Sequence, residues 1–295
     1  MQRFSISSFL LYLTSSLPFS FLYVLSNFAY FVLYHIIGYR RKVVQKNLAN
    51  SFPEKTAEER RVIERKFFRF LPDLMVEALK MRTITRDQML KRMDFVNPEV
   101  ITDFLGQGRP VVILTAHYGN WEWGIYRLGI MTEMPVLIIY KPLTNKKFDR
   151  IFNEVRSRFG ALMVPMKQTL RQVMKHRDQP HLSVFVADQA PPYQGSDYVV
   201  EFLNQPTLVF TGAGRIAQKL DAPMVYCHID RVRRGYYSCR FTILTDRPND
   251  FTVHELADQY NQFTEEIIRN KPELWLWSHN RWKRKPKDHP EANLR

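Results

Sequence analysis

Short apolar runs alternate with amphipathic helical stretches along most of this chain. The runs with strand character cover residues 111–115, 134–140, 182–187, 199–203, 224–229 and 237–244. Stretches with apolar residues at helical spacing cover 121–130, 145–159, 167–176, 212–220 and 253–270. Because strands that alternate with helices form sheets with helical cover, the pattern predicts an α/β fold with a mixed sheet flanked by helices. No internal repeat is present.

The N-terminal part has a different pattern. Residues 17–37 are mostly apolar, with polar interruptions that include Asn27 and His35, and a basic cluster, Arg40, Arg41 and Lys42, follows them. This length matches the ~20 residues that span a bilayer. The basic cluster predicts that the catalytic side is cytoplasmic. No small-residue cleavage site is present, so we expect the segment to be retained as a membrane anchor. A buried first helix of a soluble domain is the alternative, because Asn27 and His35 are costly in lipid.

These patterns divide the chain into three expected parts. Residues 1–38 form the N-terminal membrane anchor, and residues 39–108 form a helical, membrane-proximal segment with helices over 39–50 and from Thr56 onward. Residues 109–295 form the α/β catalytic core, which ends in an aromatic and basic stretch.

Composition and charge narrow the class of protein. The 295 residues are 45% hydrophobic, enough for a sizeable core. Lys and Arg number 43 against 29 Asp and Glu, and the net charge of +14 suits anionic lipid, nucleic acid or an acidic carrier protein. Cys227 and Cys239 have no metal-ligand spacing, so we expect a reducing compartment, no disulfide and a packing role for both thiols.

The most informative local pattern is His117 followed five positions later by Glu122. Two positions five apart on one helix diverge by about 140°, so the pair can meet only if His117 lies in the turn before the helix. Glu122 could then hold one imidazole nitrogen and raise the basicity of the other, as a general base requires. Helix capping by Asn120 and Glu122 is the structural alternative.

Two predicted turns follow neighbouring strands and carry polar residues. His117 follows the strand 111–115, and Asp188 with Gln189 follows the strand 182–187. Because ligands collect outside the carboxyl ends of strands in open α/β sheets, both turns could face one crevice. Arg156 lies next to the apolar stripe of helix 145–159 and could reach the edge of that crevice. A solvated charge for Arg156 and an ordinary turn residue for Asp188 are the alternatives.

At this point the chain resembles a known family. It is similar to the bacterial lipid A biosynthesis acyltransferases, a branch of the lysophospholipid acyltransferase superfamily with the hallmark His, four residues, then Asp or Glu. Here the hallmark is His117 and Glu122. The other matching positions extend over nearly the whole chain: Asn47-Leu48, Phe52-Pro53, Tyr140-Lys141-Pro142, Asn145, Asp149, Arg156, Gly160, Asp188-Gln189, Phe202, Pro206-Thr207, Ala222-Pro223 and 272–283.

The resemblance implies transfer of a fatty acyl group from an acyl thioester to a hydroxyl of a lipid A precursor or related lipid. Either acyl carrier protein or coenzyme A would carry the acyl group, no metal or other cofactor would be needed, and the enzyme would work at the cell inner membrane. His117 would be the base, Glu122 its orienting carboxylate, and Arg156 would bind or polarise the thioester. The residues expected to bind substrate are Asn120, Trp121, Lys141, Asn145, Asp188 and Gln189.

Two alternatives remain open from the sequence. An acyltransferase of the same chemistry could use an amino-acid-containing lipid, a glycolipid or a lysophospholipid as acceptor. A membrane-tethered nucleic-acid-binding protein would explain the basic tail, with Arg281, Lys283, Arg284, Lys285 and Lys287. No nucleic-acid-binding module is recognisable, and we expect no nucleic-acid partner. Trp275, Trp277 and Trp282 would instead suit the water–lipid interface, or else an ordinary core helix.

Overall fold

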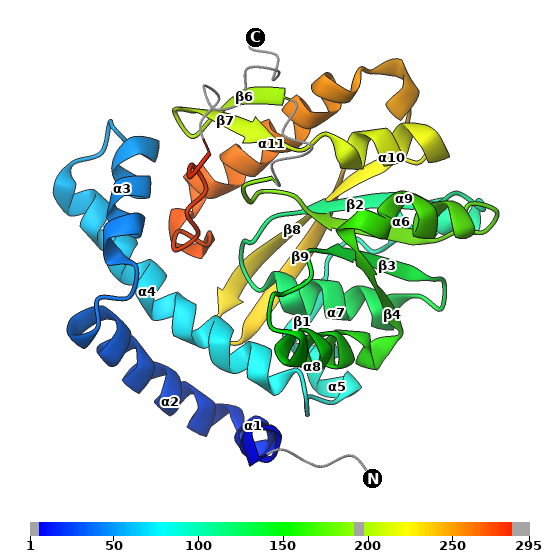
Figure 1. Ribbon diagram of the computed structural model, residues 1–295. Coiled ribbons are helices and arrows are strands. Elements are labelled where there is room, and N and C mark those ends of the chain that lie inside the picture. Colours follow the sequence, from blue (N-terminus) through cyan, green and yellow to red (C-terminus); the bar gives the residue numbers. More distant parts are fainter. Residues whose placement is uncertain (1–5, 192–197, 285–295) are drawn as a thin grey trace.

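A seven-stranded sheet forms the centre of the molecule in the computed structural model, which describes residues 6–191 and 198–284 (Figure 1). The strand order is β1-β9-β8-β2-β5-β3-β4. These strands are β1 (Met93–Phe95), β2 (Val111–Thr115), β3 (Val136–Tyr140), β4 (Ala161–Pro165), β5 (Leu182–Val186), β8 (Met224–Arg233) and β9 (Tyr236–Thr245). Within this sheet β8 and β9 pair in antiparallel fashion, and the other five pairings are parallel. The prediction of a mixed sheet flanked by helices is therefore confirmed.

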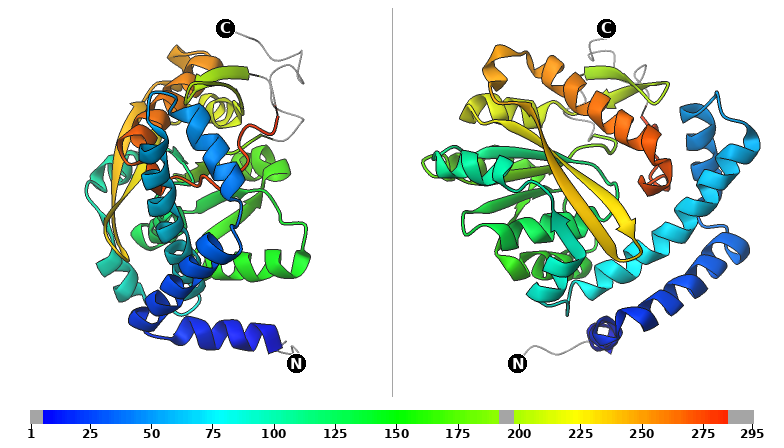
Figure 2. Two further views of the ribbon diagram at one scale, coloured as in Figure 1. Left: turned by 90° about the vertical axis from the view of Figure 1, so that its left-hand side faces the viewer. Right: turned by 180° about the vertical axis from the view of Figure 1, so that it is seen from behind.

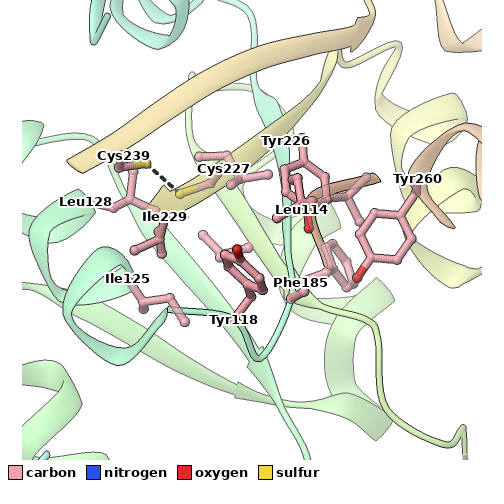
Figure 3. Close-up of a cluster of buried hydrophobic side chains, with 14 of the residues drawn as sticks. Leu114, Tyr118, Ile125, Leu128, Phe185, Tyr226, Cys227, Ile229, Cys239 and Tyr260 are labelled. Carbon is pink, nitrogen blue, oxygen red and sulfur yellow. Dashed lines mark hydrogen bonds between the residues drawn. The ribbon is translucent and has the colours of Figure 1, made fainter. Parts of the chain in front are cut away.

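The central strand β2 is buried at all five of its positions. Strands of a parallel sheet lie between two layers, so they read as continuous apolar runs without alternation. Leu114 of β2 packs in a cluster with Phe185 of β5 and Tyr226 of β8 (Figure 3). Cys227 and Cys239 are free and buried in this cluster, with their Sγ atoms 2.9 Å apart, in the packing role expected of them.

Helices cover the sheet and connect its strands. α7 (Trp121–Met131) contacts β1, β3 and β8, whereas α6 (Glu99–Gly106) contacts β2 and β9. The remaining helices of this part are α5 (Arg86–Arg92), α8 (Lys146–Arg156), α9 (Thr169–Lys175), α10 (Gly212–Leu220) and α11 (Val253–Asn270). Three short 3₁₀ turns, η2 (Ser157–Phe159), η3 (Met166–Gln168) and η4 (Pro248–Asp250), lie between these elements, and η5 (Pro272–Leu274) follows α11.

The long helix α4 (Ala57–Lys80) connects the N-terminal helices to the sheet. It begins with a capping box between Thr56 and Glu59, in which each side chain bonds the backbone N–H of the other residue. α1 (Ile6–Ser16), α2 (Phe19–Phe31) and α3 (Arg41–Ser51) all pack against α4, and α2 runs along its outer side (Figures 1 and 2).

The apolar segment predicted over residues 17–37 is α2 continued by a π-helical turn, η1 (Val32–Ile36). Residues Phe19–Ile36 have a mean hydropathy of 1.4, and 17% of them are buried. By length and composition this helix could cross a membrane, a criterion that core helices and signal sequences also meet.

Some elements escaped the sequence pattern. β1 lies in the main sheet although residues 39–108 were predicted to be helical, and its three residues are too few to show a period. β4 and β7 (Gln205–Val209) were not predicted either. β7 pairs with β6 (Tyr198–Phe202), which was predicted over residues 199–203, and the two strands form a separate hairpin. Its two-residue turn has Leu203 and Asn204 at φ 51° and 59°, as in a type I′ turn, and the sequence there lacks the usual glycine.

Candidate active site

His117 lies in the turn between β2 and α7, as its spacing to Glu122 predicted. The backbone of this turn is held by the C-terminal segment: Leu276 N–H donates to the carbonyl of His117 at 3.0 Å, and Gly119 N–H donates to that of Leu274 at 3.0 Å. Gly119 has φ +58°, and a Cβ there would lie 2.5 Å from the carbonyl oxygen of Ile229. Only glycine fits this conformation and this close approach.

The carboxylate that holds the imidazole is Asp188. Its Oδ1 accepts from Nδ1 of His117 at 2.7 Å and from the backbone N–H of the same residue at 3.0 Å. The prediction that Glu122 makes this contact is wrong. β2 and β5 pair in parallel with Thr115 opposite Val186, so the residues two positions beyond each strand meet at the carboxyl edge.

Trp275 completes the surroundings of this carboxylate. Its indole Nε1 donates to Oδ2 of Asp188 at 2.7 Å, so both carboxylate oxygens are bound. Burial by itself raises the pKa of Asp188, but the charge of His117 and the hydrogen bonds from His117 and Trp275 outweigh it and lower that pKa below its usual range. Asp188 is therefore ionised, and in the neutral form of the imidazole it accepts the Nδ1 proton and leaves Nε2 as the hydrogen-bond acceptor.

Glu122 instead pairs with Arg156. Both Glu122 oxygens accept from the guanidinium, Oε2 from Nε at 2.9 Å and Oε1 from Nη2. Burial opposes both charges, but the opposite charge and the two hydrogen bonds lower the pKa of Glu122 and raise that of Arg156. Glu122 sits in the first turn of α7, where the helix directs it toward α8. Glu122 also lies close enough to His117 for the protonated form of the imidazole to lower the pKa of Glu122 further.

An apolar cavity of about 330 Å³ begins at this ion pair. The charged residues that line this cavity are Arg82, Glu122 and Arg156. The other lining residues come from α1, α4 and its C-cap, and α8: Leu11, Met75, Ala78, Leu79, Met81, Phe148, Ile151, Phe152 and Val155. Its size falls in the range of small-ligand pockets, ~300–1,000 Å³. The stripe of phenylalanine and isoleucine that the sequence placed on one face of residues 145–159 therefore lines a cavity.

Two further predicted residues lie close to His117. The Trp121 ring is 5.0 Å from the His117 ring between centroids. Asn120 is the N-cap of α7, where Oδ1 accepts from Trp123 N–H at 3.0 Å, while Nδ2 donates to Glu77 at 2.6 Å. The capping alternative thus holds for Asn120, and its part in substrate binding stays a prediction. Gln189 follows Asp188 and is half-buried.

Lys141 and Asn145 lie farther along the chain in the exposed loop between β3 and α8. Asn145 Oδ1 accepts from Phe148 N–H at 3.3 Å, a helix-capping contact. Their assignment to substrate binding also stays a prediction.

The C-terminal segment, residues 272–283, forms part of the site. The sequence pattern had placed its tryptophans at the water–lipid interface or in a core helix. Trp275 and Trp277 are buried rather than at a lipid interface, and the segment is a series of turns rather than a helix. Asn47 of α3 holds it by donating to the carbonyls of Trp277 at 2.9 Å and His279 at 3.0 Å. The only sequence signal was the resemblance of 272–283 to a family signature. Lys285 and Lys287 of the basic tail lie outside the described residues.

His279 from this segment faces the turn after β5. Its Nε2 accepts from the backbone N–H of Ala190 at 3.3 Å. Burial, together with the positive charges of His117, Arg281 and Lys283, lowers the pKa of His279 to about 4, although Asp188 opposes this. A neutral His279 can therefore accept this hydrogen bond and hold the turn that carries Asp188.

Comparison with known proteins shows which family this chain belongs to. The model of the bacterial lipid A biosynthesis acyltransferases matches residues 2–284. The chain is 24% identical over 249 residues to the lipid A biosynthesis palmitoleoyltransferase of Escherichia coli (strain K12), covering 84% of this chain and 80% of that protein. It is 25% identical over 255 residues to the lauroyltransferase of the same organism, covering 85% and 81%. The match to its myristoyltransferase is 23% over 236 residues, covering 78% and 71%. The chain is therefore an acyltransferase and belongs to the bacterial lipid A biosynthesis acyltransferase family.

Proposed function

We propose that this enzyme transfers a fatty acyl group from an acyl thioester to a hydroxyl of a lipid A precursor, with His117 as the general base. The observation that carries the proposal is the His117–Asp188 hydrogen bond of 2.7 Å beside the Glu122–Arg156 end of the apolar cavity. A base, a fixed cation and an apolar cavity are what acyl transfer to a lipid hydroxyl requires. The names of the relatives support lipid A as the acceptor class.

The reaction follows from the hydrogen bond of Nδ1 to Asp188. Nε2 of His117 removes the proton of the acceptor hydroxyl. At the same time the hydroxyl oxygen attacks the thioester carbon, and a tetrahedral intermediate forms. When the carbon–sulfur bond breaks, the imidazolium returns that proton to the leaving thiolate. The products are an ester and a free thiol, and no acyl-enzyme intermediate forms. Asp188 stabilises the imidazolium throughout.

Arg156 and Glu122 would act together in this reaction. Their ion pair uses Nε and Nη2 of Arg156, so Nη1 lies outside the pair and can donate to the thioester oxygen as negative charge develops there. One well-placed donor to such an oxyanion contributes ~3 kcal/mol. In this proposal Glu122 positions Arg156 at the cavity. The spacing had instead indicated that Glu122 orients His117.

The acyl chain would occupy the apolar cavity between α4 and α8. The acyl donor would be acyl carrier protein or coenzyme A, and the net charge of +14 suits either of these acidic carriers. The enzyme would act at the cytoplasmic face of the inner membrane, held by the apolar N-terminal helices. The nucleic-acid-binding alternative is dropped because the chain is an acyltransferase.

The test is mass spectrometry of the products formed by the purified protein. Each thioester donor is offered with a lipid A precursor, a lysophospholipid, a glycolipid or an amino-acid-containing lipid, and His117→Ala serves as the inactive control. Acylation of the lipid A precursor at the highest rate is expected. A precursor that stays unmodified while another acceptor is acylated would overturn the acceptor assignment.

A further inference from the structure

A second cavity, of about 430 Å³, has a different character from the apolar one. It lies between α2, α4 and the β8–β9 hairpin, three elements that meet at one side of the molecule (Figures 1 and 2). Its lining is polar and mostly basic: Asn27, Tyr30, Arg69, Asp73, Arg231 and Arg234. None of these residues belongs to the site described above, so the role of this arginine cavity is open.

A single carboxylate lies among three guanidinium groups. Asp73 accepts from Arg231 at 2.7 Å and from Arg234 at 2.6 Å, and Ser26 donates to it at 2.6 Å. This side chain is buried and both of its oxygens are bound, so it has no capacity left for Arg69. Three positive charges against one negative charge leave a surplus of positive charge in the cavity.

The surplus charge belongs to Arg69. In the part of the chain that the structure describes, the ion pairs do not include Arg69, whose guanidinium instead lies 5.5 Å from the centre of the Tyr30 ring. Arg231 is accounted for, because its Nη2 donates to Asp73 at 2.7 Å and its guanidinium lies 5.1 Å from the centre of the Phe70 ring. A ligand that balances the charge of Arg69 must be anionic.

Arginine side chains bind phosphate well because their planar donors match two phosphate oxygens at once. Asn27 and Tyr30 add polar groups of the kind that orient such a ligand. We propose that the arginine cavity binds the phosphate group of an anionic lipid.

The surroundings of the cavity favour a lipid over a free phosphate ion. Phe21 and Phe28 of α2 are 62% and 67% exposed, and Val232 at the end of the β8–β9 hairpin is 66% exposed. Large apolar side chains so fully exposed indicate a surface that meets membrane. A cavity flanked by α2 and this hairpin would lie at headgroup level, so this inference rests on the membrane association proposed above.

The experiment measures flotation of the full-length protein with vesicles. The vesicles contain phosphatidylcholine alone, phosphatidylcholine with phosphatidylglycerol, or phosphatidylcholine with phosphatidate. Arg69→Gln removes a cavity charge that has no carboxylate partner, so the fold is retained. Arg65→Gln on the same helix is the matched control, because it removes an equal charge that pairs with Glu58 at 3.1 Å outside the cavity.

We expect the unmodified protein to float more tightly with either anionic vesicle than with phosphatidylcholine. Arg69→Gln should reduce that preference roughly tenfold, the scale of one charge-assisted hydrogen bond, and Arg65→Gln should leave it nearly unchanged. Equal losses in the two variants would overturn the proposal, because they would indicate only diffuse attraction between charges. Flotation that does not depend on anionic lipid would also overturn it, while leaving membrane association intact.

Inorganic phosphate separates the two sources of the ligand. In detergent, phosphate should raise the melting temperature of the unmodified protein more than chloride at equal ionic strength, and less so in Arg69→Gln. If phosphate stabilises the protein in this way but the protein floats with none of the vesicles, both the lipid assignment and the membrane association are overturned. The ligand of the cavity would then be a soluble phosphate. No response to phosphate and no preference for anionic vesicles would overturn the phosphate site itself.

Discussion

Trp275 donates a hydrogen bond of 2.7 Å from its indole nitrogen to Oδ2 of Asp188, 87 residues earlier in the chain. The other oxygen of the same carboxylate holds His117. Trp275 therefore acts on the candidate base through Asp188, which makes it a positioning residue. The C-terminal segment fixes the orientation of the imidazole as well as the backbone of its turn.

Trp275→Phe should lower kcat about tenfold, because one hydrogen bond to a buried carboxylate contributes on the order of 1.5–3 kcal/mol. KM for the thioester should change little, since Trp275 is not among the residues that line the apolar cavity. The pKa of Asp188 should rise, which would shift the acid limb of the kcat–pH profile. The matched control is Trp282→Phe, which removes an indole bond of the same 2.7 Å length to Thr207. Equal kinetics in both variants would contradict a positioning role.

Asp188→Asn should lower kcat by ~10²-fold or more, because a neutral amide can select the wrong imidazole tautomer. His117→Ala should lose at least as much, ~10²-fold or more. Glu122→Gln should lose less, because it leaves the His117–Asp188 hydrogen bond in place. Initial rates are compared at a temperature well below the melting temperature of every variant, so that each protein is folded. A larger loss in Glu122→Gln than in Asp188→Asn would restore the orienting role to Glu122.

The Glu122–Arg156 pair should show strong coupling in stability. Its side chains are 15% and 24% exposed, and removing one partner of a buried pair costs ~3–5 kcal/mol. Glu122→Gln and Arg156→Gln should each destabilise the fold, and the double variant should lose much less than the sum. The free energy of unfolding in denaturant measures this cycle. Additive losses would show that the two residues act independently.

Glu77 should give the protein a pH-dependent stability. Burial raises its pKa to about 7, although hydrogen bonds from Tyr237, Tyr23 and Asn120 oppose the rise. The unfolded state has the ordinary glutamate pKa of 4.5, so between this pH and about 7 the folded state binds the extra proton. Stability therefore falls as pH rises through this window and levels off above it.

Glu77→Gln should remove this slope. The free energy of unfolding is measured for both proteins at intervals from pH 4.5 to 8. As pH rises, the unmodified protein should lose stability relative to Glu77→Gln. A difference independent of pH would show that Glu77 does not titrate in this range.

The exposed face of α2 should hold the enzyme at the membrane. Deleting residues 1–38 would also remove Tyr23 and Ser26, which bond to the buried Glu77 and Asp73, so loss of function could then reflect misfolding. Replacing Phe21 and Phe28 with Gln avoids this problem, because both side chains are exposed.

We expect the Phe21→Gln/Phe28→Gln protein to move to the soluble fraction with an unchanged melting temperature. It should lose activity on membrane-embedded acceptor and keep activity on a water-soluble short-chain analogue. A soluble enzyme must extract its lipid against ~0.8 kcal/mol per CH₂. Leu170→Gln, at an exposed apolar position on α9, is the control. Full activity on membrane lipid in the soluble double variant would contradict the anchoring role.

The sequence by itself determined most of the helices and strands and the position of the candidate base. The buried run at 111–115 and the helix at 253–270 coincide with β2 and α11, because burial and helical period are local properties of the chain. The position of His117 before a helix followed from the spacing to Glu122, and family membership followed from motifs spread over the chain.

The tertiary structure alone decided which carboxylate meets the imidazole. Asp188 is 71 residues from His117 and reaches it because β2 and β5 are parallel neighbours in matched register. Glu122 is close in sequence, but the helix directs it to Arg156. The burial of Trp275 and the arginine cavity likewise depend on distant segments. Strand pairing and helix docking set these contacts, and neither has a local period that a sequence pattern can show.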